Sequence, residues 1–474
     1  MLMSILPSSS STTEVLCYGL GLAFCAVMVL LKWNDIRYRR KGVPPGTMGW
    51  PVFGETSGFL KQGPDFMKDK RARYGNLFKT HALGSPTVIS MDPKVNKNLL
   101  MNETQGLIPG YPVSMRNILG NNNIAAVHGA FHKRIRGSML SLVGPPAIKN
   151  HLLTRTEHFM KSFLDNWAGQ TIDIQDKTKQ MAFFVSMNLI VDDEPKSFHE
   201  AFKAKFDNIL LGTISLPINI PGTNYYKGLQ AREKVNAVLK ELLAKRRASD
   251  APHDDILDQL LRWEDPKYKL NDEEIIDQII TILYSGYETV STTTMMAIKY
   301  LHDNPKVLQE LREEHFAILE RKRSDDEPLT WEDYKNMSLT RAVILETSRL
   351  ASVVNGVLRK TNTDVELNGF IIPKGWRVYV YTREINYDPF LYSEPFSFNP
   401  KRWLKTSLEA HPHNMLFGSG IRICPGKELG IVKISVFLHH FVTKFRWEEE
   451  EGNKLRQFPR VEAPNGLNIR VTQY

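Results

Sequence analysis

The chain has 474 residues, of which 42% are hydrophobic, 10% aromatic and 24% charged, and these proportions exclude a disordered scaffold. Its formal net charge of +9 is modest for this length and suits an anionic membrane surface or an acidic protein partner, with no indication of nucleic acid binding. Two of the three cysteines lie in an apolar N-terminal run, so the rest of the chain holds one thiol and no disulfide framework. The length alone fits about three domains or one large domain.

The N-terminal run is VLCYGLGLAFCAVMVLL, residues 15–31, and it carries no charge. As a helix it would be about 25 Å long, the short end of a membrane span. No lysine or arginine precedes it, whereas basic residues cluster at 32–41, which is the reverse of a cleaved signal peptide. The positive-inside rule therefore predicts a lumenal N-terminus and transmembrane anchor over residues 1–31, with the rest of the chain in the cytoplasm.

The next segment is VPPGTMGWP, residues 43–51, in which prolines lack amide donors and glycines disfavour a helix. This pattern predicts a stiff, extended connector. We therefore expect a basic flank and proline-rich hinge over residues 32–51, followed by one globular body over residues 52–474.

The body shows mostly helical periodicity. The clearest predicted helices cover residues 183–190, 235–247, 273–300 and 305–321. The third of these is long and broadly apolar, so we expect it to run through the core. Strand patterns flank Asn368-Gly369, a dipeptide suited to a two-residue hairpin turn, and recur at 378–380. The predicted fold class is mainly α with small β-sheets, and residues 215–228 are predicted to form an irregular loop that touches lipid.

The remaining cysteine, Cys424, lies in FGSGIRICPG, residues 417–426, directly before a predicted helix at 427–437. The glycines allow tight turns and the close approach of a flat group, and a thiolate at the start of a helix is favoured by the aligned peptide dipoles. Zinc would need further cysteine or histidine ligands at close spacing. A single axial thiolate is the ligand of haem iron where an O–O bond is cleaved.

Residues 417–426 resemble the haem-binding signature of the cytochrome P-450 superfamily, Phe-x-x-Gly-x-Arg-x-Cys-x-Gly, at every fixed position. The resemblance implies the cytochrome P-450 fold and haem b, with Cys424 as the iron ligand. The segment HKRIR at 132–136 is similar to the family's propionate-binding helix. The residues that the resemblance places around the cofactor are Phe417, Arg422, Gly426, His132, Arg136 and Arg359.

Glu346 and Arg349 stand three residues apart on one predicted helix face and resemble the family's Glu-x-x-Arg motif. In the family this pair is structural and binds a downstream arginine, a position that Arg402 in FNPKRW takes here. The prolines that usually follow the motif are replaced by residues 351–353, Ala-Ser-Val, which is a departure from the family pattern.

The segment SGYETV at 285–290 lies inside the long apolar helix, where glycine costs about 1 kcal/mol against alanine and indicates a local distortion or the close approach of a ligand. It resembles the family's oxygen-activation motif. The resemblance implies that Gly286 leaves room for dioxygen, that Thr289 donates a hydrogen bond to the bound oxygen and that Glu288 takes part in proton delivery. Ser285 and Val290 depart from the motif.

Longer stretches, among them PPGTMGWPVFGETSGFLKQGP, ILYSGYETVSTTTMMAIKYLHD and IPKGWRVYVYTREINYD, resemble the plant brassinosteroid 6-oxidases. The resemblance implies NADPH- and O2-dependent oxidation of a 6-deoxocastasterone-type precursor at carbon 6 to the alcohol and then the ketone, and in some members onward to a lactone. Electrons would come through a membrane-bound NADPH–cytochrome reductase with an acidic docking surface. The enzyme would be a single-pass protein of the endoplasmic reticulum membrane with a cytosolic haem-thiolate catalytic domain.

Three alternatives stay open. A related plant haem-thiolate oxidase acting on a triterpenoid or diterpenoid would share the catalytic motifs, and only substrate-lining segments would differ, for which residues 109–119, 353–356 and 465–466 are the candidates. Rearrangement of a hydroperoxide would need neither reductase nor dioxygen, and the retained Glu288 and Thr289 argue against it. A sterol-binding protein without turnover would not need the complete set of motifs.

Overall fold

The computed structural model describes residues 9–474 except 102, 104, 193, 250, 252, 264, 325, 406 and 407, with the backbone alone for residues 9–15. The chain forms two compact units. One comprises residues 1–90 and 361–379, and the other comprises residues 91–360 and 380–474. The strands β5, Gly356–Thr361, and β8, Arg377–Tyr381, run across this division.

The first unit combines short helices with two hairpins. Its elements are α1 (Ser9–Leu31), α2 (Trp33–Arg37), α3 (Thr56–Gln62), α4 (Pro64–Tyr74), β1 (Leu77–Ala82), β2 (Ser85–Ser90), β6 (Val365–Leu367) and β7 (Phe370–Ile372). Strands β1 and β2 pair antiparallel, as do β6 and β7, with Leu367 opposite Phe370. Asn368 and Gly369 have φ angles of 50° and 78°, so the predicted two-residue hairpin turn is confirmed.

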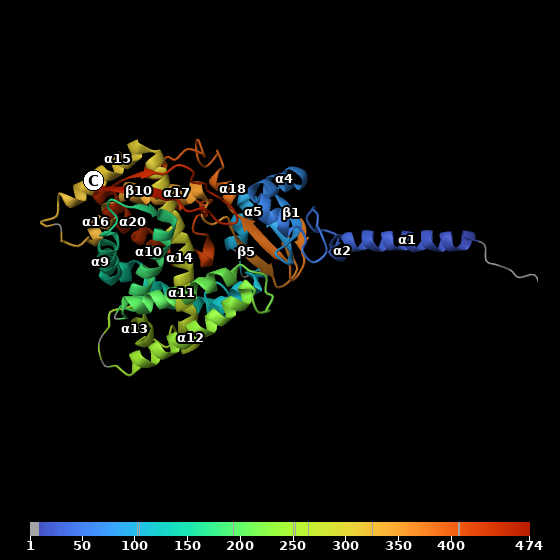
Figure 1. Ribbon diagram of the computed structural model, residues 1–474, viewed down its shortest axis with the longest axis horizontal. Helices are drawn as coiled ribbons and strands as arrows, with labels where there is room; N and C mark the ends of the chain where they lie inside the picture. Colours follow the sequence, from blue (N-terminus) through green and yellow to red (C-terminus); the bar gives the residue numbers. More distant parts are fainter. Residues whose placement is uncertain are drawn as a thin grey trace, which may run out of the picture. The chain divides into compact units, whose positions relative to one another are not determined.

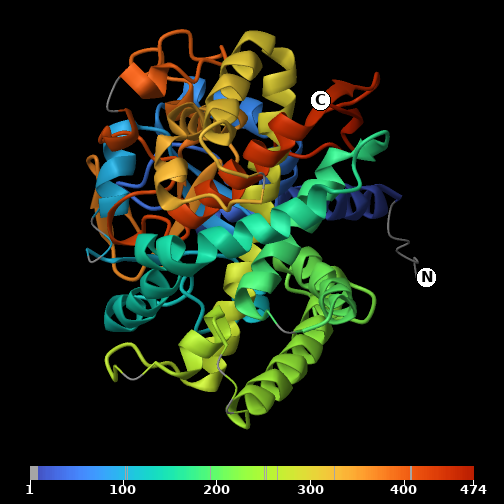
Figure 2. The ribbon, with the colours of Figure 1, turned by 90° about the vertical axis from the view of Figure 1, so that its left-hand side faces the viewer.

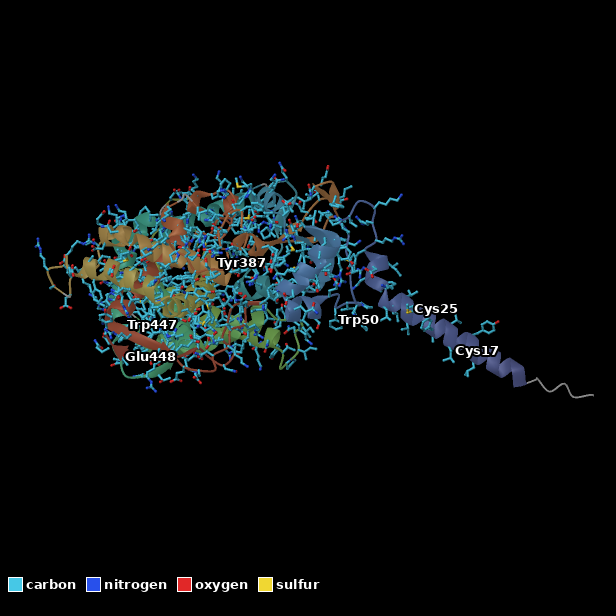
Figure 3. The ribbon with its side chains drawn as sticks, turned by 90° about the horizontal axis from the view of Figure 1, so that it is seen from above. Cys17, Cys25, Trp50, Tyr387, Trp447 and Glu448 are labelled. Carbon is cyan, nitrogen blue, oxygen red and sulfur yellow. The ribbon has the colours of Figure 1, made fainter. Side chains whose placement is uncertain are left out.

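Helix α1 contains the apolar N-terminal run, and Cys17 and Cys25 lie along it (Figure 3). Within the part of the chain that the structure describes, no helix combines the length and the apolar character that a membrane span requires. Residues 38–55 form no helix, as the prolines and glycines of 43–51 predict. The carbonyl of Pro45 instead accepts a hydrogen bond from the amide of Lys79 at 2.8 Å.

The second unit is mainly helical, which confirms the predicted fold class. Its helices in the first half are α5 (Pro93–Met101), α6 (Val113–Leu119), α7 (Gly129–Val143), α8 (Pro145–Ala147), η1 (Ile148–Leu152), α9 (Leu153–Leu164), α10 (Ile174–Ile190), α11 (Lys196–Thr213), α12 (Asn224–Arg247) and α13 (Ile256–Leu261). Those in the second half are α14 (Asp272–Asp303), α15 (Pro305–Leu319), α16 (Trp331–Asn336), α17 (Ser338–Ala351), α18 (Arg383–Asn386), α19 (Arg402–Lys405), η2 (Leu408–Ala410), η3 (Gly420–Arg422) and α20 (Lys427–Lys444). Its strands are β3 (Leu107–Pro109), β4 (Thr171–Asp173), β9 (Phe445–Glu449) and β10 (Asn468–Gln473), and β10 lies between β4 and β9.

Helix α14 is the central helix of this unit and packs against α10, α12, α17 and α20 (Figure 1). It begins with a capping box, in which the Asn271 side chain accepts from the Glu274 amide at 2.9 Å and the Glu274 carboxylate accepts from the Asn271 amide at 3.0 Å. The helix is continuous from Asp272 to Asp303. Gly286 lies within this stretch, so the glycine does not interrupt the helix.

Helices α11 and α12 lie side by side (Figure 2), and Gly212 and Gly228 meet where they cross closely. The loop predicted for 215–228 ends at Thr223, because the Thr223 hydroxyl accepts from the Tyr226 amide at 3.2 Å and caps α12. The prediction was thus wrong for residues 224–228. Exposed apolar side chains gather in and beside the loop at Leu211, Ile214, Leu216, Ile218 and Ile220.

Helix α20 carries a buried lysine in the interior of the second unit. The Lys433 ammonium donates a hydrogen bond to the Ser186 hydroxyl of α10 at 2.9 Å. Desolvation lowers the pKa of Lys433 to about 7, since burial without a nearby carboxylate disfavours the charged form.

Replacing Lys433 by Met should stabilise the protein at neutral pH. The folded-state pKa of about 7 lies below the usual 10.5, so the destabilisation is complete below pH 7 and disappears as the pH rises to 10.5. At about 1.4 kcal/mol per pKa unit, Lys433→Met gains a few kcal/mol in the free energy of unfolding at pH 7. Urea unfolding at neutral pH and at about pH 9.5 measures the difference.

The matched control is Lys444→Met on the same helix, because Lys444 is partly exposed and pairs with Asp165 at 3.4 Å. This control should show no gain that grows toward neutral pH. An equal gain for Lys433→Met at both pH values would show that the buried charge is not its cause.

Candidate active site

The loop around Cys424 is shaped by backbone contacts. The Cys424 amide donates to the Phe417 carbonyl at 2.9 Å, and α20 begins at Lys427. Gly420 has a φ of 67°, and a Cβ there would lie 2.5 Å from the Leu100 carbonyl oxygen. Only glycine fits this position without moving the backbone.

The Cys424 thiol is accessible although protein surrounds much of it. Its side chain is exposed, yet desolvation is the largest influence on the thiol and raises its pKa. Exposure and desolvation occur together in a group that solvent can reach but that protein largely surrounds. The amides of Gly426 and Lys427 and the charge of Arg136 oppose the shift, because they stabilise a thiolate at the start of a helix.

Arg422 ties this loop to the segment before α7. Its guanidinium donates to the Ile124 carbonyl at 3.1 Å and the Val127 carbonyl at 2.6 Å, and it pairs with Glu103. Arg359 is buried with its Nε 4.0 Å from a Glu103 oxygen, and that Nε has no hydrogen-bond partner in the described structure. Desolvation lowers the pKa of Arg359, so its charge is poorly compensated.

His132 and Arg136 come from α7 and add to the same positive region. The Arg136 guanidinium donates to the Ile423 carbonyl at 2.7 Å, next to the cysteine. His132 is buried, and desolvation, followed by the charge of Arg422, lowers its pKa to about 4. The histidine is therefore neutral at physiological pH and able to donate one hydrogen bond.

These residues fit haem on their own chemistry. Three arginines and a histidine lie near the thiol, and among the described residues one carboxylate, Glu103, is paired with them. A buried guanidinium with an unpartnered Nε favours a carboxylate ligand, and haem carries two propionates beside an iron that takes a thiolate. Cys424, Arg359, Arg136, Arg422 and His132 are the residues that would hold it.

The predicted oxygen-activation residues lie on α14. Ser285 and Thr289 are exposed although most of the helix around them is buried, and they stand one turn apart, so both lie on one accessible face of α14. The Thr289 hydroxyl donates to the Ser285 carbonyl at 2.8 Å. A Cβ at Gly286 would have one neighbour within 4 Å, the Ser186 hydroxyl at 3.4 Å, so there is room beside the glycine.

The structure brings Glu346, Arg349 and Arg402 together. Glu346 and Arg349 are fully buried, with a carboxylate oxygen 2.8 Å from the Arg349 Nη2 and 3.1 Å from the Arg402 Nε. The Trp403 indole also donates to Glu346, at 2.8 Å. Trp403 was missed by sequence reasoning although it directly follows Arg402, because tryptophan carries no charge to pair with the motif.

The segment that lacks the usual prolines is held by hydrogen bonds instead. Ser352 takes a left-handed conformation with a φ of 48° and ends α17. Its hydroxyl accepts from the Asn386 side chain at 3.1 Å, and the Tyr387 hydroxyl donates to the Leu350 carbonyl at 2.8 Å. These contacts fix the chain between Arg349 and Arg359 without proline.

A cavity of about 420 Å³ opens beside residues 108–131. Four of its lining residues, Pro109, Tyr111, Met115 and Arg116, belong to the predicted substrate-lining segment 109–119. The other two candidate segments, 353–356 and 465–466, are not among the lining residues that the structure describes. The cavity is therefore formed by the region between β3 and α7.

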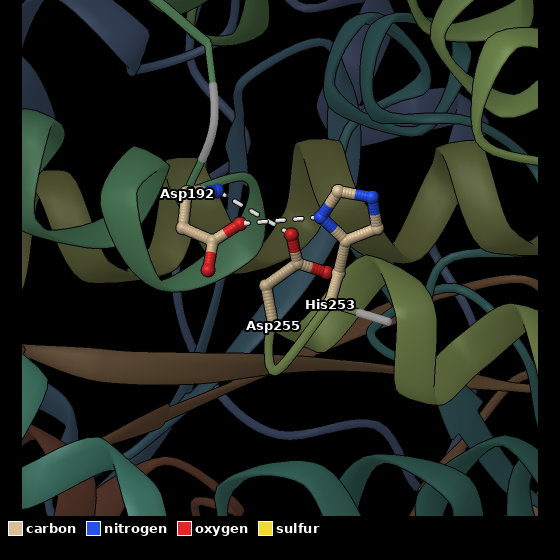
Figure 4. A group of neighbouring side chains, drawn as sticks. All are labelled: Asp192, His253 and Asp255. Carbon is tan, nitrogen blue, oxygen red and sulfur yellow. Dashed lines mark hydrogen bonds and ion pairs between the residues drawn. The ribbon is translucent and has the colours of Figure 1, made fainter. Parts of the chain in front are cut away.

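A second group of possible metal ligands comprises Asp192, His253 and Asp255 (Figure 4). The Asp192 amide donates to Asp255 at 3.3 Å, and the His253 ring lies 3.9 Å from an Asp192 oxygen. Arg246 pairs with Asp255 at 2.8 Å and Arg155 with Asp192 at 3.1 Å. Two arginines therefore balance the carboxylates, and the group is an ion-pair cluster that ties α9 and α12 to the loops.

Replacing Glu346 by Gln should strongly destabilise the fold, because Arg349 would stay buried without a counter-charge. Loss of one partner of a buried pair costs about 3–5 kcal/mol. Urea unfolding of Glu346→Gln against Glu310→Gln, whose partner Lys401 is half exposed at 2.6 Å, measures the effect. The control should leave the midpoint nearly unchanged, and equal midpoints for both variants would contradict the role of Glu346.

The comparisons with known proteins agree with this geometry. The sequence model of the cytochrome P450 family matches residues 44–467. Cytochrome P450 85A of Phaseolus vulgaris is 60% identical over 455 residues, covering 96% of this chain and 97% of its own. The 3beta,22alpha-dihydroxysteroid 3-dehydrogenase of Arabidopsis thaliana is 37% identical and covers 95% of this chain and 97% of its own.

The fold has a counterpart among solved structures. Retinoic acid bound cyanobacterial CYP120A1 superposes with a TM-score of 0.81 at 26% sequence identity, covering 91% of this chain and 99% of that one. The family match spans the Cys424 loop, the α14 motif and the buried Glu346 pair together. The chain therefore belongs to the cytochrome P450 family, as a haem-thiolate monooxygenase that is similar to the 85A members over nearly its whole length.

Proposed function

We propose that the enzyme is a brassinosteroid C-6 oxidase, which converts a 6-deoxocastasterone-type steroid to the alcohol and then to the ketone castasterone. The observation that carries this proposal is the 60% identity to a cytochrome P450 85A over 96% of the chain, which includes the cavity-lining residues 108–131 as well as the haem frame. A more distant relative is named for a dihydroxysteroid, which supports a steroid substrate. NADPH and O2 are the co-substrates.

Haem, when bound, supplies the redox chemistry that places one oxygen atom of O2 on the substrate carbon. The chain's own task is to hold the cofactor and to aim the substrate. The Cys424 thiolate is stabilised by the start of α20, and Arg359, Arg136 and Arg422 neutralise the propionates. The cavity beside residues 108–131 would hold the steroid and aim carbon 6.

Proton delivery depends on α14. The Thr289 hydroxyl lies on the accessible face of α14, where it could release its hydrogen bond to the Ser285 carbonyl and donate to the reacting oxygen. Glu288, the preceding residue, is partly exposed, with 26% of its side chain accessible. It can therefore exchange a proton with solvent and pass it toward Thr289.

Membrane attachment is also proposed. The side chains described on α1 are exposed and apolar, including Leu16, Leu20, Leu22 and Phe24, and basic residues follow at 32–41. We propose residues 1–31 as a single-pass anchor in the endoplasmic reticulum, 32–51 as its hinge and 52–474 as the cytosolic catalytic domain. The exposed apolar loop between α11 and α12 would touch the lipid, and an NADPH–cytochrome reductase would supply the electrons.

Membranes that contain this chain, a reductase, NADPH and 6-deoxocastasterone should yield the C-6 ketone, detected by mass spectrometry. Cys424→Ala should yield none, because the variant lacks the thiolate that ligates the iron. A lactone would extend the reaction. No product from wild-type protein that has normal thiolate ligation in its reduced carbon monoxide complex would exclude this substrate and favour a triterpenoid or diterpenoid.

Thr289→Ala should uncouple the reaction, because the hydroxyl that guides the proton is lost. We expect NADPH oxidation to continue while ketone formed per NADPH falls about tenfold, with the missing electrons recovered as hydrogen peroxide. The control is Thr294→Ala, since the Thr294 hydroxyl makes the same kind of bond, to the Val290 carbonyl at 2.8 Å, in a fully buried place. Equal yields per NADPH in both variants would contradict the role of Thr289.

A further inference from the structure

The Glu288 carboxylate is held by an arginine that is distant in the sequence. The Arg460 Nη1 donates to the Glu288 Oε1 at 3.1 Å, and 39% of the arginine side chain and 26% of the glutamate side chain are accessible. Arg460 belongs to the segment between β9 and β10. Neither the α14 motif nor the family signature contains this residue.

The segment that carries Arg460 forms a closed loop. The amides and carbonyls of Arg456 and Glu462 are hydrogen-bonded in both directions, at 2.8 and 2.9 Å. The Glu462 carboxylate accepts from the Arg460 Nε at 2.9 Å and also pairs with Arg456. One side of the Arg460 guanidinium is thus fixed by its own loop, and the other side is directed at Glu288.

Two further elements hold this loop in place. The Gln175 side chain of α10 donates to the Ala463 carbonyl at 2.8 Å and accepts from the Ala463 amide at 2.7 Å. The Asn355 side chain, from the turn before β5, donates to the Pro459 carbonyl at 3.1 Å. These bonds anchor Arg460 to the scaffold rather than to α14 alone, so its position does not depend on Glu288.

The charges around Arg460 also favour its ion pair with Glu288. Desolvation opposes the charged form of Arg460, but Glu288 and Glu462 outweigh it and raise its pKa. Glu462 is shared between Arg456 and Arg460, so Glu288 supplies the second counter-charge of this cluster. The second ion pair therefore restrains Glu288, which would otherwise sample several rotamers on a partly exposed helix face.

We propose that Arg460 is a positioning residue of the oxidation, which fixes the Glu288 carboxylate next to Thr289 and ties proton delivery to the C-terminal loop. The proposal rests on the proposed function in so far as Glu288 supplies protons. A glutamate held at one place shortens the search for a productive proton path, and loss of such placement lowers the rate although the acid itself is intact.

The test compares Arg460→Gln, Arg460→Lys and the control Arg456→Gln in the haem-loaded, full-length enzyme. Arg456 shares the Glu462 contact but has no recorded bond to Glu288, so its loss disturbs the loop alone. We expect Arg460→Gln to form about tenfold less ketone per NADPH with KM unchanged, Arg460→Lys to recover most of the yield, and Arg456→Gln to match wild type. Equal yields in Arg460→Gln and wild type would overturn the proposal.

A second measurement does not depend on the substrate. Urea unfolding of Glu288→Gln, Arg460→Gln and the double variant should be non-additive, because both single changes break the same ion pair. The coupling between Arg456→Gln and Glu288→Gln should be smaller, because these residues are linked only through Glu462 and Arg460. Additivity of Glu288→Gln with Arg460→Gln would overturn the proposal. If wild type gives no ketone, the proposed substrate is wrong, and the unfolding cycle then decides the place of Arg460 by itself.

Discussion

Buried positive charge beside Cys424 is the constraint on which the rest of the structure depends. Arg359, Arg136 and Arg422 are brought from three different segments, and Glu103 is the carboxylate described among them. Desolvating several guanidinium groups that share one counter-charge is unfavourable, so this region of the fold favours an anionic ligand. Binding of the cofactor would then also stabilise the fold. The glycines and long-range hydrogen bonds of the loop give it the shape that such binding requires.

The sequence could predict what is encoded locally. The Asn368-Gly369 turn requires positive φ angles that few other dipeptides adopt, and the long apolar pattern of α14 has the period of a helix, so both were predictable. The end of the loop at Thr223 was not, since a serine or threonine cap is recognised only when the helix start is already known. Gly286 does not interrupt α14, which packs on α10 and α20.

Contacts between segments that are distant in the sequence could not be predicted from sequence patterns. Glu103 and Arg460 have no motif around them, and each acquires its role from a partner far away along the chain. The missing prolines after α17 illustrate the same point from the other side. The hydroxyl of Ser352 and the phenol of Tyr387 fix that turn by hydrogen bonds. The turn is therefore held in place although it lacks the prolines of the family pattern.

Glu346 and Glu288 both pair with arginine, but they differ in how deeply they are buried. Glu346 is fully buried and accepts from Arg349, Arg402 and Trp403, so several donors hold the carboxylate in one place, as a structural role requires. Glu288 is partly exposed and faces one arginine, Arg460, so its carboxylate is held from one side and stays within reach of solvent. The proton delivery proposed for Glu288 needs the second environment, because a carboxylate that passes protons on must be within reach of solvent.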